Sequence, residues 1–192
     1  MNSIRWLLTA LHTQSNYTPI MKTLLVALAG ALTLYSLRAA DASATITDVH
    51  LCCKGCVSGV GKAVGTVPDA KAAVDQDART VTLTAPDAAT LQKAADALVQ
   101  AGYFGKCSDN SVKLDASTGA KGEKVQSLKI EGVHLCCGKC VKAVDHAVKS
   151  VDGVKEQTAT KGATSFEVTG DFNDQQVLDA LQKEGLTGKV AK

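Results

Sequence analysis

Valines recur at helical spacing in two segments of the chain. Two sets of four share the spacing i, i+3, i+7, i+10: Val57, Val60, Val64 and Val67, then Val141, Val144, Val148 and Val151. This spacing puts the four side chains of each set on one helix face. The pattern therefore predicts two amphipathic helices of about three turns each.

Short segments of extended character flank each of these helices. Alternating apolar and polar positions, bounded by polar turns, are typical of half-buried strands. The predicted strands are 44–51, 71–75, 80–85 and 103–107 in the first half of the chain, and 128–135, 154–158, 165–169 and 187–191 in the second.

A second helix is expected in each half, over residues 88–100 and 174–184, because apolar side chains again recur at helical spacing. Capping side chains precede these segments and glycines follow them. The expected caps are Asp87 for the first helix and Asn173 or Asp171 for the second, with Gly102 and Gly185 as terminators.

The predicted order is strand, helix, strand, strand, helix, strand, twice over. This is the order of the ferredoxin-like fold, in which a four-stranded antiparallel sheet carries two helices. We therefore expect an α+β protein with two tandem βαββαβ domains, over 43–108 and 126–192. Residues 109–125 are polar, lack apolar periodicity and predict a flexible linker.

Residues 1–42 are expected to lie outside the fold. Lys22 precedes an apolar run over 24–37, and small residues then offer a cleavage site before Ser43, with a second after Ala44. This layout is typical of a secretory signal that begins at Met21, which we take as the translation start. The sequence thus predicts a periplasmic or secreted protein.

Charge and composition exclude some partners. The chain has a formal net charge of +2 and 4% aromatic residues. After removal of 1–42, basic and acidic residues are equal in number, so no nucleic-acid surface is expected. The apolar run over 24–37 is short for a membrane span, and no membrane association is expected after signal cleavage.

Six of the seven cysteines lie in two matching clusters. Residues 49–57 read VHLCCKGCV and residues 133–141 read VHLCCGKCV, with seven of nine positions identical. Each cluster stands at the start of a predicted helix, where the helix dipole and free N–H groups favour thiolates. Thiolates bind soft metals such as Cu(I), zinc and their heavier relatives.

Each repeat has a Cys-x-x-Cys pair between the first strand and the first helix of a βαββαβ unit, and the second helix of the first repeat ends in Ala-Gly-Tyr at 101–103. In these features the chain resembles the heavy-metal-associated domain family. That family includes copper chaperones, the N-terminal domains of copper-transporting ATPases and the periplasmic mercury-binding protein. The resemblance covers nearly all of 44–108 and 126–191. It implies one ion per repeat, passed by ligand exchange to a metal-transport or chaperone protein, with these ligands: Cys53 and Cys56, then Cys137 and Cys140.

Three features depart from the family. Leucine replaces the usual methionine before the cysteines, cysteine replaces the small residue between them, and histidine replaces the glycine that starts the loop. The positions are Leu51 and Leu135, Cys52 and Cys136, and His50 and His134. A third sulfur suits Cu(I), which we favour, whereas a histidine ligand suits zinc; mercury is a further alternative.

Several of these residues have alternative interpretations. In a strand, Cys52 and Cys136 would point away from the neighbouring cysteines, so they are either buried small side chains or ligands. His50 and His134 are either structural or ligands. Cys107, on the last strand of the first repeat, is either near the metal loop or a buried thiol.

The leading functional hypothesis is a soft-metal-binding protein without enzymatic activity. The alternatives are a thiol–disulfide oxidoreductase and a disulfide-stabilised interaction module, because Cys-x-x-Cys also serves redox chemistry. Against the oxidoreductase, the part after the presequence contains only Pro68 and Pro86, and the second repeat lacks the proline that thioredoxin-like sites place opposite the pair.

Overall fold

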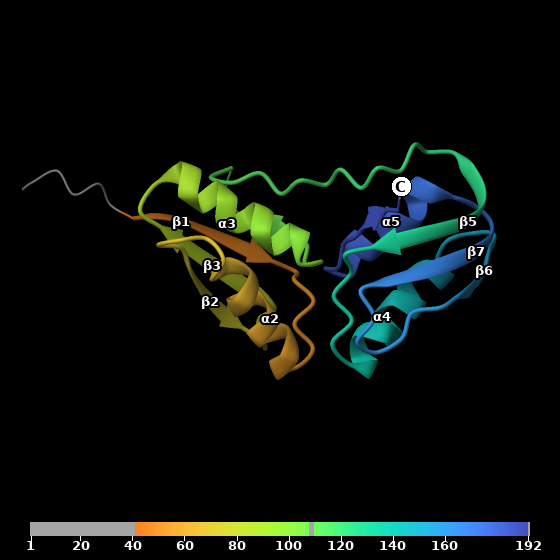
Figure 1. Ribbon diagram of the computed structural model, residues 1–192, viewed down its shortest axis with the longest axis horizontal. Coiled ribbons are helices and arrows are strands. Elements are labelled where there is room, and N and C mark those ends of the chain that lie inside the picture. The colour runs from red at the N-terminus through yellow and green to blue at the C-terminus, as the bar shows by residue number, and fades with distance from the viewer. Residues whose placement is uncertain (1–40, 108–109, 192) are drawn as a thin grey trace, which may run out of the picture. The chain divides into compact units, whose positions relative to one another are not determined.

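The computed structural model describes residues 41–107 and 110–191 (Figure 1). Each half of this part of the chain follows the order strand, helix, strand, strand, helix, strand. The first half contains β1 (Ala42–Thr47), α2 (Lys54–Val64), β2 (Lys71–Asp75), β3 (Thr80–Ala85), α3 (Ala88–Gln100) and β4 (Lys106–Cys107). The second half contains β5 (Lys124–Glu131), α4 (Gly138–Lys149), β6 (Val154–Gln157), β7 (Ser165–Asn173), α5 (Asp174–Lys183) and β8 (Lys189–Val190).

The strands form two antiparallel sheets of the same topology. The orders are β2-β3-β1-β4 and β6-β7-β5-β8, so the first strand of each half lies between the third and the fourth. Ile46 pairs with Cys107 in the first sheet, and Ile130 pairs with Val190 in the second. The α+β class is confirmed, and Cys107 and Val190 occupy matching positions in the two sheets.

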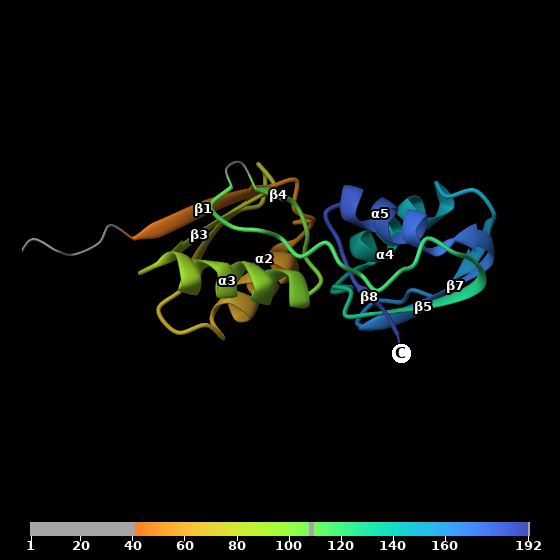
Figure 2. The same cartoon turned by 90° about the horizontal axis from the view of Figure 1, so that it is seen from above.

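Each sheet is covered by two helices on one face. Figure 2 shows α2 and α3 on one side of the first sheet, and α4 and α5 on one side of the second. The predicted helical stripes account for the packing, because Val60 and Val64 of α2 and Val144 and Val148 of α4 are buried. Burial of these apolar faces is the main stabilising contribution to each half.

Several predicted boundaries agree with the structure. Strands β2 and β3 and helix α3 have the predicted bounds. The Asp87 side chain accepts a hydrogen bond from Thr90 N, and Asn173, not Asp171, caps α5 by accepting one from Gln176 N. Gly102 and Gly185 follow the helices with positive φ angles, as expected of residues that end helices.

The strands before the cysteines end earlier than predicted. We expected 44–51 and 128–135, but β1 ends at Thr47 and β5 at Glu131. The next residues, Asp48 (φ 61°) and Gly132 (φ 78°), adopt a left-handed conformation that ends the extended backbone. The first two cysteines of each cluster therefore lie in a loop.

Residues 110–123 connect the two halves without forming a helix or strand. Gln92 and Lys113 exchange two hydrogen bonds of 2.7 and 2.9 Å, and the Gln182 side chain donates to Ala116 O. The segment thus contacts α3 of the first half and α5 of the second. The last part of the predicted linker, 124–125, belongs to β5.

Nearly all of the predicted presequence lies outside the described residues. The predicted cleavage site before Ser43 falls one residue inside β1, which begins at Ala42. Within 41–107 and 110–191, no helix is both long and apolar enough to cross a membrane.

Candidate metal centre

Each cysteine cluster crosses from a loop into the first turn of a helix. Cys53 and Cys137 occupy the N-cap positions of α2 and α4. Their carbonyl groups accept hydrogen bonds from the N–H groups of Cys56 and Cys140, at 2.9 and 3.1 Å. The thiols of each pair therefore lie beside the helix N-terminus, where the helix dipole stabilises negative charge.

The two loops come together and bring six sulfur atoms into one cluster. Cys52 Sγ lies 3.5 Å from Cys137 Sγ and 3.6 Å from Cys140 Sγ. Cys136 Sγ lies 3.5 Å from the sulfurs of Cys53 and Cys56. The six thiols, for which the sequence predicted a separate pair of ligands in each repeat, therefore lie together in one cluster.

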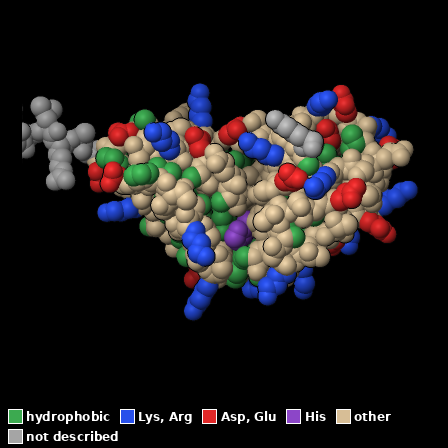
Figure 3. All heavy atoms as spheres, viewed as in Figure 1, with side chains coloured by type: hydrophobic (Ala, Val, Ile, Leu, Met, Phe, Trp, Pro, Cys, Tyr) green, Lys and Arg blue, Asp and Glu red, His purple; other side chains and the backbone are tan. Residues whose placement is uncertain are grey.

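The thiols of the cluster differ in exposure. Cys56 and Cys140 are fully buried, at 0% exposure, whereas the other four are half-buried. Lys54, Lys139 and Lys142 lie exposed around the start of the two helices. On the face drawn in Figure 3, basic and acidic side chains are interspersed and a histidine reaches the surface.

Two glycines allow the repeats to approach each other. A Cβ atom at Gly102 would lie 2.5 Å from both Gly132 O and His134 N. A Cβ at Gly185 would lie 2.5 Å from His50 N and would also overlap Asp48 O. The turn that ends each second helix thus packs against the loop that leads to the other repeat's cysteines.

His134 forms a hydrogen bond with Tyr103 of the other repeat. Its Nε2 lies 3.0 Å from Tyr103 Oη, and the two rings are 4.5 Å apart. The Tyr103 hydroxyl donates a hydrogen bond to Cys56 O at 2.9 Å. Because its only hydrogen is used there, His134 Nε2 donates the hydrogen bond to the tyrosine oxygen. Through Tyr103, His134 therefore links the second repeat to the backbone of α2 in the first repeat.

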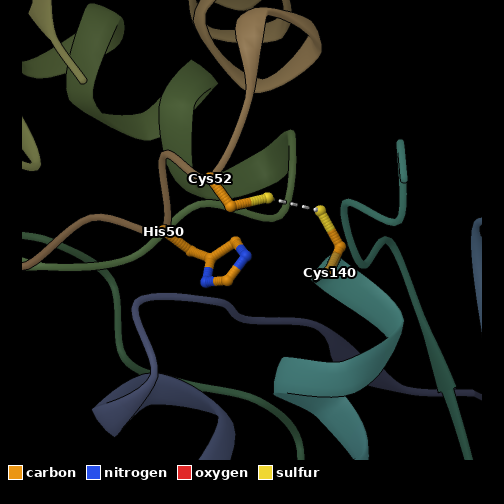
Figure 4. Close-up of side chains that lie close together, drawn as sticks. All are labelled: His50, Cys52 and Cys140. Atoms are coloured by element: carbon orange, nitrogen blue, oxygen red, sulfur yellow. Dashed lines mark hydrogen bonds between the residues drawn. The ribbon is translucent and has the colours of Figure 1, made fainter. Parts of the chain in front are cut away.

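His50 has a different environment. Its Nε2 is buried and has no hydrogen-bond partner within the described parts of the chain. It belongs to a group with Cys52 and Cys140 whose ligand atoms lie within 4.8 Å of one another (Figure 4). Burial lowers the pKa of His50, which favours the neutral, ligand-competent imidazole at neutral pH.

The clustered thiols change one another's pKa values. The hydrogen bond between Cys56 and Cys140 lowers the pKa of the Cys56 thiol and raises that of Cys140, because the pair shares a proton. Burial raises the pKa of Cys52 and Cys136. The cluster thus contains stabilised thiolate beside thiols that retain their protons at neutral pH.

Cys137 shows the effect of the helix N-terminus most clearly. Burial by itself raises its pKa, but hydrogen bonds from Cys140 N–H, the Cys52 thiol and Lys139 N–H outweigh this effect. The resulting pKa is about 6, so Cys137 is largely a thiolate at neutral pH. A thiolate is the form that binds metal.

The structure corrects the expectation for Cys52 and Cys136. We expected these side chains to point away from Cys53 and Cys137, but both lie in loops and their sulfurs join the same cluster. Cys107 lies on β4 opposite Ile46 and is absent from the groups of candidate ligands in the described chain.

Sequence reasoning missed the residues that join the repeats. It identified Gly102 and Gly185 as helix terminators and Tyr103 as part of a family motif, but not their contacts across the repeats. A signal was present, because Tyr103 is matched by Leu186 in the second repeat and Gly59 by Ala143. Such paired differences between repeats indicate residues in contact.

No family model matches the chain, and no curated protein matches it. Among solved structures, it is similar to the N-terminal domain of PacS from Synechocystis PCC6803, with 20% identity over 35% of this chain and 100% of that one, and a TM-score of 0.33. It is also similar to the N-terminal soluble domains of Bacillus subtilis CopA, with 16% identity over 79% of this chain and 95% of that one, and a TM-score of 0.29. Both scores are low, so these similarities do not indicate what this chain does.

Proposed function

We propose that this protein binds a soft metal ion through its clustered cysteine thiolates, with Cu(I) favoured over zinc and mercury. The observation that carries the proposal is the cluster of six sulfurs 3.5–3.9 Å from their neighbours. Soft thiolate ligands select Cu(I), zinc and heavier metals over calcium and magnesium. The position of Cys137 at a helix N-terminus and its lowered pKa support thiolate formation.

The proposed role is to sequester the ion or to transfer it by ligand exchange. Four of the sulfurs are half-buried, so an incoming thiolate can reach a bound ion before all protein ligands are released. The exposed lysines Lys54, Lys139 and Lys142 favour an acidic partner surface, such as that of a metal-transport or chaperone protein.

Export to the periplasm or beyond the cell is part of the proposal. Its support is the signal-like layout from Met21 to Ala42 in the sequence. N-terminal sequencing of the protein recovered from the host's exported fraction is expected to give a start at Ser43. A start at Met1 or Met21 would contradict it.

Metal competition tests the proposed function. The reduced, purified chain is titrated anaerobically against Cu(I) held by a coloured chelator, with zinc and mercury in parallel. We expect tight Cu(I) binding that is abolished when Cys53, Cys56, Cys137 and Cys140 are all replaced by serine. The control is Cys107→Ser, which alters a thiol on β4 and is expected to bind as the wild type does.

The ionisation of Cys137 favours thiol–disulfide exchange as a second candidate function. The low pKa of Cys137, about 6, gives a nucleophilic thiolate beside other thiols. The discriminating measurement is a disulfide-reductase assay on the metal-free chain. Reductase activity that depends on Cys137, together with no tight metal binding, would make this the function.

A further inference from the structure

The six sulfurs form a regular figure. Neighbouring sulfurs within and between the two loops are 3.5–3.9 Å apart. Three further pairs lie within 4.8 Å: Cys52 with Cys53, Cys53 with Cys137, and Cys136 with Cys137. These neighbouring pairs correspond to the edges of an octahedron that has a sulfur atom at each corner. The remaining pairs are its opposite corners: Cys52 and Cys136, Cys53 and Cys140, and Cys56 and Cys137.

An octahedron of donors favours trigonal ions over tetrahedral ones. Any four of its corners include an opposite pair, so no four sulfurs are all neighbours, as the closed zinc site of four thiolates requires. Its faces, in contrast, are triangles of three neighbouring sulfurs. A metal–sulfur bond of about 2.3 Å, the length in zinc thiolates, puts the corners of a trigonal site about 4 Å apart.

Four faces of the octahedron that share corners but no edges together contain each sulfur twice. They are Cys52-Cys53-Cys56, Cys52-Cys137-Cys140, Cys53-Cys136-Cys137 and Cys56-Cys136-Cys140. Three of these four triads are themselves groups of candidate ligands within 4.8 Å, and the fourth shares its Cys52–Cys140 edge with His50. One three-coordinate ion on each face makes twelve metal–sulfur bonds, which is two for each of the six thiolates.

We infer that the two repeats together hold one cluster of four Cu(I) ions, in which each of the six thiolates bridges two ions. This inference rests on the proposed soft-metal function and specifies its stoichiometry. Cu(I) is soft and adopts trigonal sites, whereas zinc in structural sites is almost always tetrahedral. Loading four Cu(I) ions displaces the protons that the thiols still hold and leaves the cluster with two negative charges, and the exposed Lys54 and Lys139 stand next to the cysteines in the sequence.

Native mass spectrometry during an anaerobic Cu(I) titration tests this stoichiometry. We expect the metal-free chain to convert to a four-copper species, with one- and two-copper species in the minority because the bridging ligands couple the sites. Saturation at one or two ions per chain would overturn the cluster but leave the soft-metal function standing. No binding would refute both.

The variant Cys52→Ser distinguishes one shared four-copper cluster from two independent Cys-x-x-Cys sites. With two independent Cys-x-x-Cys sites it would still bind two ions, because Cys52 belongs to neither pair. In the cluster Cys52 bridges two ions, so the four-copper species is expected to disappear. Cys107→Ser is the matched control and keeps four ions. Circular dichroism of the metal-free variants establishes that both are folded, and loss of four-copper loading in Cys107→Ser would contradict the assignment.

Discussion

The contrast between Gly59 and Ala143 illustrates how single residues shape the centre. Both occupy the same position in their repeat, yet Gly59 is a poor helix former in the middle of α2. A Cβ at this position would overlap Tyr103 Oη and lie 2.8 Å from His134 Cε1. In the second repeat leucine replaces tyrosine, and alanine occupies the helix position.

Two glycine-to-alanine variants in α2 are therefore expected to change stability in opposite directions. Gly61 has nothing within 4 Å of its missing Cβ, so Gly61→Ala should raise the free energy of unfolding by about 0.5–1 kcal/mol. Gly59→Ala should lower it, because the Tyr103 hydroxyl must leave Cys56 O and His134. Urea denaturation of the metal-free chains measures both, and a stabilised Gly59→Ala would contradict the packing described.

At the scale of elements, the Asp174 side chain holds the segment that leads into β5. Its side chain is 5% exposed and accepts hydrogen bonds of 2.9 Å from the N–H groups of Lys121 and Glu123. Burial alone raises the pKa of Asp174, but these backbone donors and that of Gln175 outweigh it and hold the pKa below its usual value. One carboxylate thus joins the connecting segment to the start of α5.

The contribution of Asp174 is expected to depend on pH. Because its folded pKa is lowered, the stabilisation is present above the unfolded value of about 3.9 and is lost as pH falls through the folded value. Asp174→Asn should cost about 1–3 kcal/mol at pH 7, and the difference from wild type should shrink below about pH 4. Denaturation at several pH values measures this.

The matched control for Asp174 is Asp171→Asn. Asp171 forms an ion pair with Lys124 at 3.1 Å, but both side chains are largely exposed. The expected loss at pH 7 is below about 1 kcal/mol. Equal losses for the two variants would show that the hydrogen bonds of Asp174 to the connecting segment contribute little.

The elements could be predicted because their causes are local. The periodicity of apolar side chains and the capping residues predicted the observed bounds of β2, β3 and α3. The ends of β1 and β5 were missed, since Asp48 adopts its left-handed conformation in a loop that packs against Gly185 of the other repeat. The candidate residues of the site were identified, but their union in one centre depends on contacts more than 80 residues apart in sequence, such as Cys52 with Cys137, which no local pattern encodes.

At the scale of the whole molecule, the association of the repeats is expected to control metal stoichiometry. Gly185→Ala would push the second repeat's turn away from His50 without altering a ligand. Gly162→Ala is the control, because Gly162 has a similar φ of +86° but nothing within 4 Å. Both variants bear the strain of a left-handed alanine, about 1 kcal/mol.

Cu(I) titration by native mass spectrometry distinguishes these two variants. We expect Gly185→Ala to lose the four-copper species and Gly162→Ala to keep it. If Gly185→Ala remains folded and still loads four ions, the close approach at this turn is not what assembles the centre.

The segment 110–123 has a further consequence, because it makes the meeting of the two cysteine loops an intramolecular event. Two separate domains would have to find each other at a rate that falls with dilution, whereas tethered halves have an effective concentration set by the tether. Filling of the centre should therefore be independent of protein concentration. A single molecule would take up its full load even where the protein is scarce, and no encounter between copies would be needed.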